Sequence, residues 1–115
     1  DMVIKSSVNR SAMKISIIQN IDRKIPLEDI AHSKNMGFDE LLTEIESIVA
    51  SGTRLDINYY IEENIDEYNQ VDILEYFREA DSDTIEDAME ALGENDYSEE
   101  EVRLMRIKFF SEVGN

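Results

Sequence analysis

The sequence predicts an all-α protein, with a helix-turn-helix unit followed by a small helical bundle and about six or seven helices in all. Helix-forming residues dominate the 115 residues, which include only four Gly and one Pro. Strand-like alternation is nearly absent, whereas apolar residues recur at helical spacing, most clearly over residues 25–52. A chain of this length buries about two-thirds of its unfolded surface, enough for one core.

Residues 1–10 carry Ser, Asn and basic residues without periodicity, and we interpret them as the end of a linker. The alternative is a basic arm that uses Lys5 and Arg10 to contact phosphates. Because the sequence starts at Asp1 rather than at an initiator Met, we expect it to be a segment of a longer protein.

Residues 11–22 are predicted to form the first helix, with Ser11 as its N-cap. The apolar stripe consists of Met13, Ile17, Ile18 and Ile21. Arg23 and Lys24 follow the helix, where positive charge meets the negative end of the helix dipole. Phosphate contact is the functional alternative for these two residues.

A short second helix is expected to open at Pro26, since a Pro at the first helical position lacks an N–H that would be unpaired anyway. Leu27, Ile30 and Ala31 form its apolar face. Residues 34–37 then break the pattern and contain Asn and Gly, which adopt a left-handed backbone most easily.

The third predicted helix is longer and ends at Gly52. Its apolar stripe consists of Leu41, Leu42, Ile45, Ile48 and Val49. A short helix, a tight turn and a longer helix make up the helix-turn-helix plan.

The exposed face of that longer helix would enter the major groove if the unit read DNA bases. The face consists of Asp39, Glu40, Thr43, Glu44 and Ser47. Carboxylates accept hydrogen bonds from cytosine but repel the phosphates of the groove walls. We therefore favour a solvated face that reads no bases, with insertion into the groove as the alternative.

Two further polar residues of the first half, His32 and Arg54, have two interpretations each. His32 is the sole histidine in a chain without Cys, so it cannot build a zinc site, and it is either a surface residue or, with Lys34 nearby, a phosphate contact. Arg54 contacts either a phosphate or a carboxylate. A small wing at residues 54–57 is a further possibility.

Two helices are predicted to follow this unit. Asp56 is a suitable N-cap for residues 57–64, with Ile57, Tyr60 and Ile61 facing inward. Asp66 or Glu67 opens the next helix, which runs to about residue 80.

The last two helices have clear boundary signals. Asp83 is the expected cap of a compact helix that Gly93 closes, and Ser98 with Glu101 forms a capping box for a helix through about residue 113. The apolar residues of this last helix are Val102, Leu104, Met105, Ile107, Phe109 and Phe110. Because they surround the helix, we expect it to be the spine of the second half. An exposed edge at Phe110 would suit docking on a parent protein.

The net charge of −16 is unevenly distributed. Residues 1–58 hold seven basic and nine acidic residues, for a net charge of −2, and residues 59–115 hold four and eighteen, for −14. An acidic half repels nucleic acid, so we expect phosphate contacts only in the first half. Glu86, Asp87 and Glu90 either decorate a solvated helix face or dock on a basic partner.

The sequence excludes several classes of site. It has no Walker-type phosphate loop, no calcium-loop spacing, no Cys and no supportable Ser/His/Asp arrangement, so we predict no catalysis, no metal site and no small-molecule substrate. No apolar run approaches the roughly 18 residues of a membrane span, and no secretory signal is present. We expect a cytoplasmic protein without membrane partners.

Four short stretches carry a resemblance to a known family. They are Pro26-Leu27-Glu28-Asp29-Ile30-Ala31, then Ser51-Gly52, then Leu55-Asp56-Ile57, and finally Tyr97-Ser98 with Glu100-Glu101-Val102-Arg103-Leu104. In this order and spacing the chain resembles the helix-turn-helix domain that follows the helicase core of bacterial RecQ-type DNA helicases. The sequence departs from that family at Glu40 and Glu44, where Thr or His is frequent, and this argues against base reading.

The resemblance implies a non-catalytic accessory domain of an ATP-dependent DNA helicase in repair and recombination. ATP and Mg²⁺ would be bound by the helicase core and not by this chain. We expect weak, non-specific phosphate contacts from the basic residues Lys14, Arg23, Lys24, Lys34 and Arg54. The alternatives are an acidic module that binds the helicase core or another protein, and a fragment of a transcription regulator. We divide the chain into a linker end at 1–10, a helix-turn-helix subdomain at 11–58 and an acidic helical subdomain at 59–115.

Overall fold

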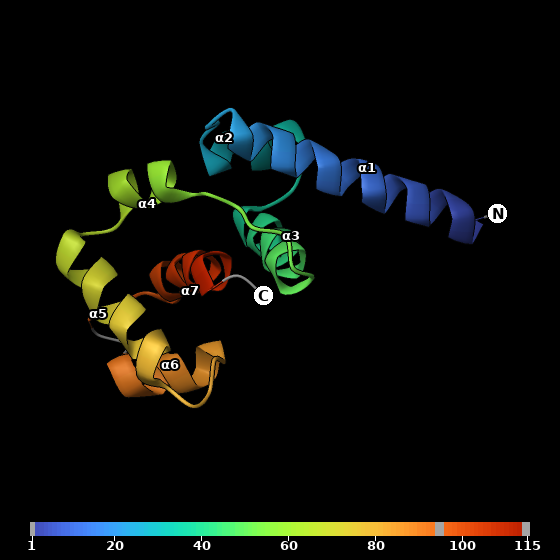
Figure 1. Cartoon of the computed structure of the whole chain (residues 1–115). Helices are drawn as coiled ribbons and strands as arrows, with labels where there is room; N and C mark the ends of the chain where they lie inside the picture. Colours follow the sequence, from blue (N-terminus) through green and yellow to red (C-terminus); the bar gives the residue numbers. More distant parts are fainter. Residues whose placement is uncertain (1, 94–95, 114–115) are drawn as a thin grey trace.

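The computed structural model describes residues 2–93 and 96–113, and this part of the chain consists of helices and connecting segments without strands (Figure 1). The seven helices are α1 (Met2–Asp22), α2 (Leu27–Ser33), α3 (Phe38–Ala50), α4 (Asn58–Asn64), α5 (Glu67–Glu79), α6 (Ile85–Leu92) and α7 (Glu99–Val113). The predicted all-α class, with a helix-turn-helix unit ahead of a small bundle, is confirmed.

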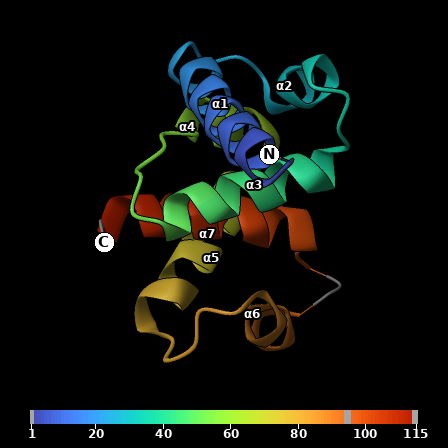
Figure 2. The same ribbon diagram turned by 90° about the vertical axis from the view of Figure 1, so that its right-hand side faces the viewer.

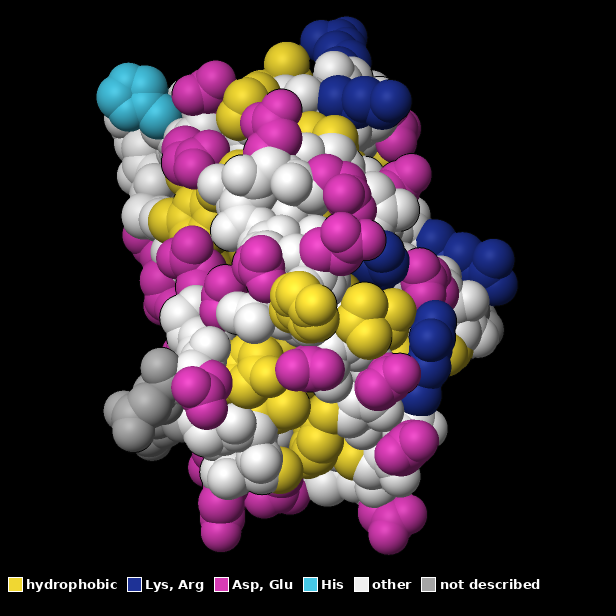
Figure 3. All heavy atoms as spheres, turned by 90° about the vertical axis from the view of Figure 1, so that its left-hand side faces the viewer, with side chains coloured by type: hydrophobic (Ala, Val, Ile, Leu, Met, Phe, Trp, Pro, Cys, Tyr) yellow, Lys and Arg dark blue, Asp and Glu magenta, His cyan; other side chains and the backbone are white. Residues whose placement is uncertain are grey.

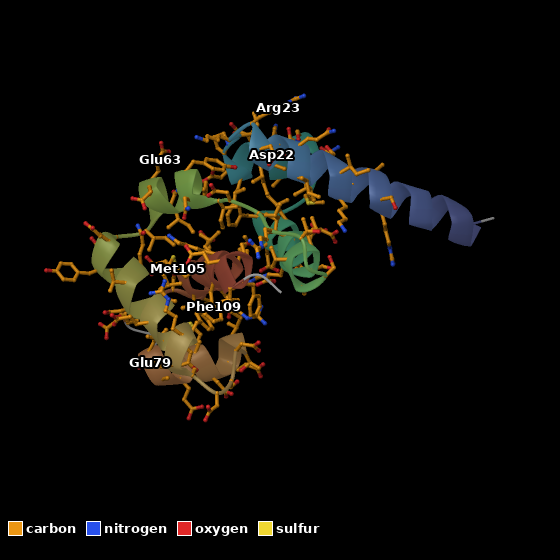
Figure 4. The ribbon with its side chains drawn as sticks, viewed as in Figure 1. Asp22, Arg23, Glu63, Glu79, Met105 and Phe109 are labelled. Carbon is orange, nitrogen blue, oxygen red and sulfur yellow. The ribbon has the colours of Figure 1, made fainter. Side chains whose placement is uncertain are left out.

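Helix α7 lies at the centre of the molecule. It packs against α3, α4, α5 and α6, while α1 packs against α2 and α3. Figures 1 and 2 show α3 between the α1–α2 pair and α7, with the N-terminal part of α1 projecting away from the other helices. In Figure 4, Met105 and Phe109 of α7 lie inside the molecule, whereas Glu63 and Glu79 lie at its edge. The predicted spine of the second half therefore also supports the first half.

One apolar core extends through both halves of the chain. Its fully buried members include Ile17, Leu41, Ile45, Ile61, Ile73, Leu104 and Met105. The inward positions predicted for the fourth helix, Ile57, Tyr60 and Ile61, are all buried. A division of the chain near residue 58 stays a prediction.

Helix α1 begins at Met2, well ahead of the predicted start at Ser11. Residues 2–10 contain neither Gly nor Pro, so no residue there opposes extension of the helix toward the N-terminus. Ser11 thus lies inside the helix and does not cap it. A linker role for this segment remains untested.

Three helices end in a Schellman motif with a residue in the left-handed region, at Lys24 (φ 61°), Asn35 (φ 55°) and Gly52 (φ 104°). Each has the paired backbone bonds of that motif, as where the N–H groups of Gly52 and Thr53 donate to the carbonyls of Val49 and Ile48. Helix α6 also ends at a residue with positive φ, the predicted Gly93 (φ 96°), whose N–H donates to the Met89 carbonyl. Asn35 and Gly52 act as predicted, but Gly37 has φ −72° and needs no glycine freedom. Lys24 adopts this backbone against its own steric preference.

The capping predictions are confirmed at two helices. The Asp66 carboxylate accepts from the Tyr68 N–H at 3.1 Å. Ser98 and Glu101 form the reciprocal capping box, with both bonds at 3.1 Å.

The other caps differ from the prediction by one position. Asp83 is wrong as the cap of α6, because Thr84 holds the extended N-cap backbone and its hydroxyl accepts from the Asp87 N–H at 3.2 Å. Pro26 is the N-cap of α2 rather than its first helical residue. Ile57 occupies the N-cap position of α4, yet the Asp56 carboxylate still accepts from the Asn58 N–H at 3.0 Å.

Candidate nucleic-acid interface

Several side chains on the exposed face of α3 already form hydrogen bonds or ion pairs within the protein. Glu40 turns back to its own helix start, where its carboxylate accepts from the Gly37 N–H at 3.0 Å. Asp39 and Thr43 are bound by Arg103 of α7. Of the five predicted face residues, Glu44 and Ser47 have no such partner among the side chains of residues 10–93 and 96–113.

Arg103 joins α7 to α3 through a buried guanidinium. Its Nε and Nη2 donate to the two carboxylate oxygens of Glu46 at 3.0 and 2.8 Å, in the bidentate geometry that Arg forms best. Its Nη1 donates to the Asp39 carboxylate, and Nη2 also donates to the Thr43 hydroxyl at 3.2 Å. The bonds to Glu46 raise the pKa of Arg103 above its ordinary value despite the opposing effect of burial.

The contacts of Arg103 with α3 limit the ability of this helix to read DNA bases. A recognition helix lies in the major groove and contacts base edges with residues of its N-terminal part. Here α7 covers one edge of the exposed face of α3, and the edge that stays open carries a carboxylate. Geometry and charge together favour an α3 that reads no bases.

Arg103 could not be assigned from the sequence, although it stands in a stretch used for the family resemblance. Its one signal is a basic residue between Val102 and Leu104 on a helix that is apolar on most sides. That signal predicts a buried guanidinium with an acidic partner, but not which partner.

A shallow groove of about 350 Å³ runs between α1 and α3. Arg10 and Lys14 line it from α1, and Glu44, Ser47 and Ser51 line it from α3. Ile21, Ile17, Lys14 and Arg10 follow one another at spacings of four, three and four residues, so Lys14 and Arg10 continue the buried stripe and point toward α3 instead of away from the molecule. Two cations, one carboxylate and two hydroxyls therefore face one another.

The other predicted phosphate contacts lie elsewhere. Arg23 and Lys24 are exposed at the turn between α1 and α2, and Figure 4 shows Arg23 pointing away from the molecule. The Lys34 ammonium donates to the Ser16 hydroxyl of α1 and is half-buried.

Arg54 lines a hollow of about 340 Å³ together with Lys108 and three carboxylates, those of Asp22, Asp56 and Glu112. The five predicted basic residues are thus dispersed, and only Lys14 lies beside the open edge of α3. Arg10 lies there too, a residue that the sequence analysis named only as part of the alternative basic arm.

Charge on the α4–α5 side is mostly negative. Figure 3 shows Asp and Glu side chains over this whole face, Lys and Arg at its top and along one edge, and hydrophobic side chains in the middle. His32 lies at a corner of this view and is exposed. Within the described ranges, no group of three His, Cys, Asp or Glu could hold a metal ion.

Comparison with known families gives a match in the first half of the chain. Residues 11–61 match the RecQ-1-like helix-turn-helix domain. The match covers less than half of the chain and supports a helix-turn-helix domain of RecQ type over these residues. The matched residues cover most of α1, all of α2 and α3, and the beginning of α4. No curated protein is similar enough to the chain to count as a match.

Two tyrosines of α4 are hydrogen-bonded to the turn before α2 and to α2 itself, within the residues that match. The Tyr59 hydroxyl donates to the Ile25 carbonyl, and the Tyr60 hydroxyl donates to Glu28 at 2.6 Å. Burial, followed by the charge of Asp56, raises the pKa of Tyr59 to about 12. Burial and the bond to Glu28 raise the pKa of Tyr60 as well.

The residues predicted to contact proteins lie outside the matched RecQ-1-like residues. Glu86, Asp87 and Glu90 are exposed on α6. Phe110 is half-buried, since the Arg106 guanidinium lies 4.5 Å above the centre of its ring and the Phe109 ring lies 5.8 Å away. An open apolar edge at Phe110 is therefore smaller than the sequence suggests.

Among the described helices, none has the length and apolar character to cross a bilayer.

Proposed function

We propose that the chain is a non-catalytic accessory domain of a RecQ-like ATP-dependent DNA helicase and that it contacts DNA through phosphates. The observation that carries this proposal is the match of residues 11–61 to the RecQ-1-like helix-turn-helix domain. ATP and Mg²⁺ would belong to the helicase core, so the domain would contribute binding and positioning without chemistry.

The groove between α1 and α3 is the best-supported contact site. Arg10 and Lys14 are exposed cations four residues apart on one helix, and the Ser47 hydroxyl faces them, whereas the Ser51 hydroxyl already donates to the Ile48 carbonyl at 2.7 Å. Cationic side chains and hydroxyls are the groups that bind phosphate oxygens without reading sequence. Arg23 and Lys24 at the end of α1 would extend the contact along the backbone.

The distribution of charge sets the orientation of DNA in this proposal. The second half carries a net charge of −14 and would repel the phosphate backbone. DNA would therefore approach along α1 and the open edge of α3, with α5 and α6 turned away. A transcription regulator is the weaker candidate, because α7 and Arg103 occupy an edge of α3 that base reading would need.

Fluorescence anisotropy with labelled single-stranded, duplex and forked DNA at two salt concentrations tests the proposal. The wild-type chain should bind weakly, and its affinity should fall as salt rises, because phosphate contacts release counterions. The double variant Arg10→Gln/Lys14→Gln should lower the slope of log affinity against log salt by up to about two, one for each lost contact.

The matched control is Arg78→Gln/Lys108→Gln, which removes two cations that both lie near Glu112 in the second half. This variant should keep the wild-type slope. Binding that ignores salt, no binding at high micromolar protein, or equal slopes for the two double variants would contradict phosphate contact at the groove.

A further inference from the structure

An open hollow of about 900 Å³ lies between α6 and the beginning of α7. Its rim carries three carboxylates, Glu86, Glu90 and Glu99, and its floor is lined by Ile85, Met89 and Tyr97. We propose that this hollow docks a basic peptide segment of a partner protein, in which apolar side chains are flanked by Lys or Arg.

The three rim carboxylates are free. All three are exposed, and none forms an ion pair or a hydrogen bond within residues 10–93 and 96–113. Arg103 and Arg106 line an adjoining hollow together with Glu86 and Glu99, but Arg103 binds Glu46 and the Arg106 Nε donates to the Asp83 carbonyl. Negative charge at this rim is therefore available to a partner.

Helix stability does not explain the rim. Glu86 and Glu99 lie in first turns, where a carboxylate complements the helix dipole. Glu90 lies in the C-terminal half of α6, where the dipole disfavours it, and it stands four residues from Glu86, a spacing at which like charges destabilise a helix. A local cost of this kind is consistent with a role in binding.

The floor suits apolar side chains. Ile85 and Met89 are half-buried one turn apart on α6, and a Met side chain adapts readily to different partners. Tyr97 is fixed from the other side, since its hydroxyl donates to Asp72 at 2.6 Å. An amphipathic basic segment would meet both the floor and the rim.

Other occupants fit less well. In the described part of the chain no group of acidic residues is arranged to hold a metal ion. A nucleic acid would be repelled by the rim, and a second copy of a chain with a net charge of −16 would be repelled as a whole. A basic peptide is therefore the partner that best fits the charge and the shape of this hollow.

The test is an anisotropy titration of the full 115-residue chain against a labelled synthetic peptide that has two Leu flanked by Lys residues. The chain should bind this peptide, more weakly as salt rises. Replacement of all three rim carboxylates, Glu86→Gln/Glu90→Gln/Glu99→Gln, should weaken binding roughly tenfold, since several exposed ion pairs are lost together. A peptide with Ser in place of Leu should bind less tightly than the parent peptide.

A control with the same change in net charge is Glu62→Gln/Glu63→Gln/Glu67→Gln, on α4 and α5, which should bind like the wild type. No binding by the wild type, equal weakening by the two triple variants, or equal affinity for the Ser peptide would overturn the proposal. The hollow shares no lining residue with the groove of Arg10 and Lys14, so this proposal and the DNA proposal can fail separately.

Discussion

At the scale of single residues, Arg103 has the largest structural role. It is only 9% exposed and contacts three residues of α3 from the N-terminal half of α7. Its main partner, Glu46, is also shielded, with 19% of its side chain exposed, whereas Asp39 is open to solvent at 84%. Most of the energy of the contact should therefore reside in the Glu46 pair, since exposed pairs contribute little.

Arg103→Met should lower the free energy of unfolding by about 3 kcal/mol, because it leaves the Glu46 carboxylate shielded and unpaired. Urea denaturation followed by circular dichroism measures this change. Arg78→Met is the matched control, since Arg78 and its partner Glu112 are 57% and 45% exposed. The control should change stability by less than about 0.5 kcal/mol. Equal stability of the two variants would contradict the role given to Arg103.

Tyr59 makes the stability of the folded state depend on pH in the alkaline range. Its pKa is raised to about 12 from an ordinary 10.0, so folding favours the protonated phenol. The stability from this group is fully present below about pH 10 and is lost as the pH rises toward 12. Tyr97, whose bond to Asp72 also raises its pKa to about 12, contributes in the same direction.

Tyr59→Phe should therefore flatten the fall in stability between about pH 10 and 12. At neutral pH the variant should lose about 1 kcal/mol, the typical contribution of one hydrogen bond. Urea denaturation over a pH series gives both values. Tyr68→Phe, which removes a hydroxyl from a residue that is 82% exposed, serves as the control and should follow the wild type. An unchanged alkaline slope in Tyr59→Phe would show that this phenol does not couple to folding.

At the scale of helices and turns, local chemistry explains what the sequence could predict. The box of Ser98 and Glu101, the Asp66 cap and the Gly52 ending each depend on bonds within a few residues, so spacing alone reveals them. The start of α1 could not be placed, because no breaker residue marks it. Asp83 and Thr84 are both good N-caps one position apart, and propensity does not choose between them.

Gly52→Ala should lower the free energy of unfolding by about 1 kcal/mol, because φ is 104° there and an alanine is strained in that region. No atom lies within 4 Å of the added Cβ, so the cost comes from the backbone alone. Gly37→Ala is the matched control, with φ −72° and a Cβ 3.7 Å from the Glu40 carboxylate. It should change stability by less than about 0.5 kcal/mol in either direction. Thermal denaturation of both variants measures the difference, and equal losses would contradict the assignment of Gly52 as the helix stop.

At the scale of the whole molecule, one core joins two halves of very different charge. Sequence periodicity predicted which residues are apolar and inward, but not that α7 would pack on α3 across more than fifty residues of chain. For the same reason the sequence identified the basic residues but did not predict their surroundings, which depend on tertiary packing. Lys14 lies beside α3, Arg54 lies among carboxylates, and Lys34 is bound to Ser16.

The most direct test of the account is to map DNA contacts on the folded chain by nitrogen-15 NMR during titration with forked DNA at low salt. The account predicts shifts at Arg10, Lys14, Ser47 and Ser51, with α5 and α6 unchanged. Shifts centred on α5 or α6, or none at any DNA concentration, would contradict phosphate binding along α1 and the open edge of α3.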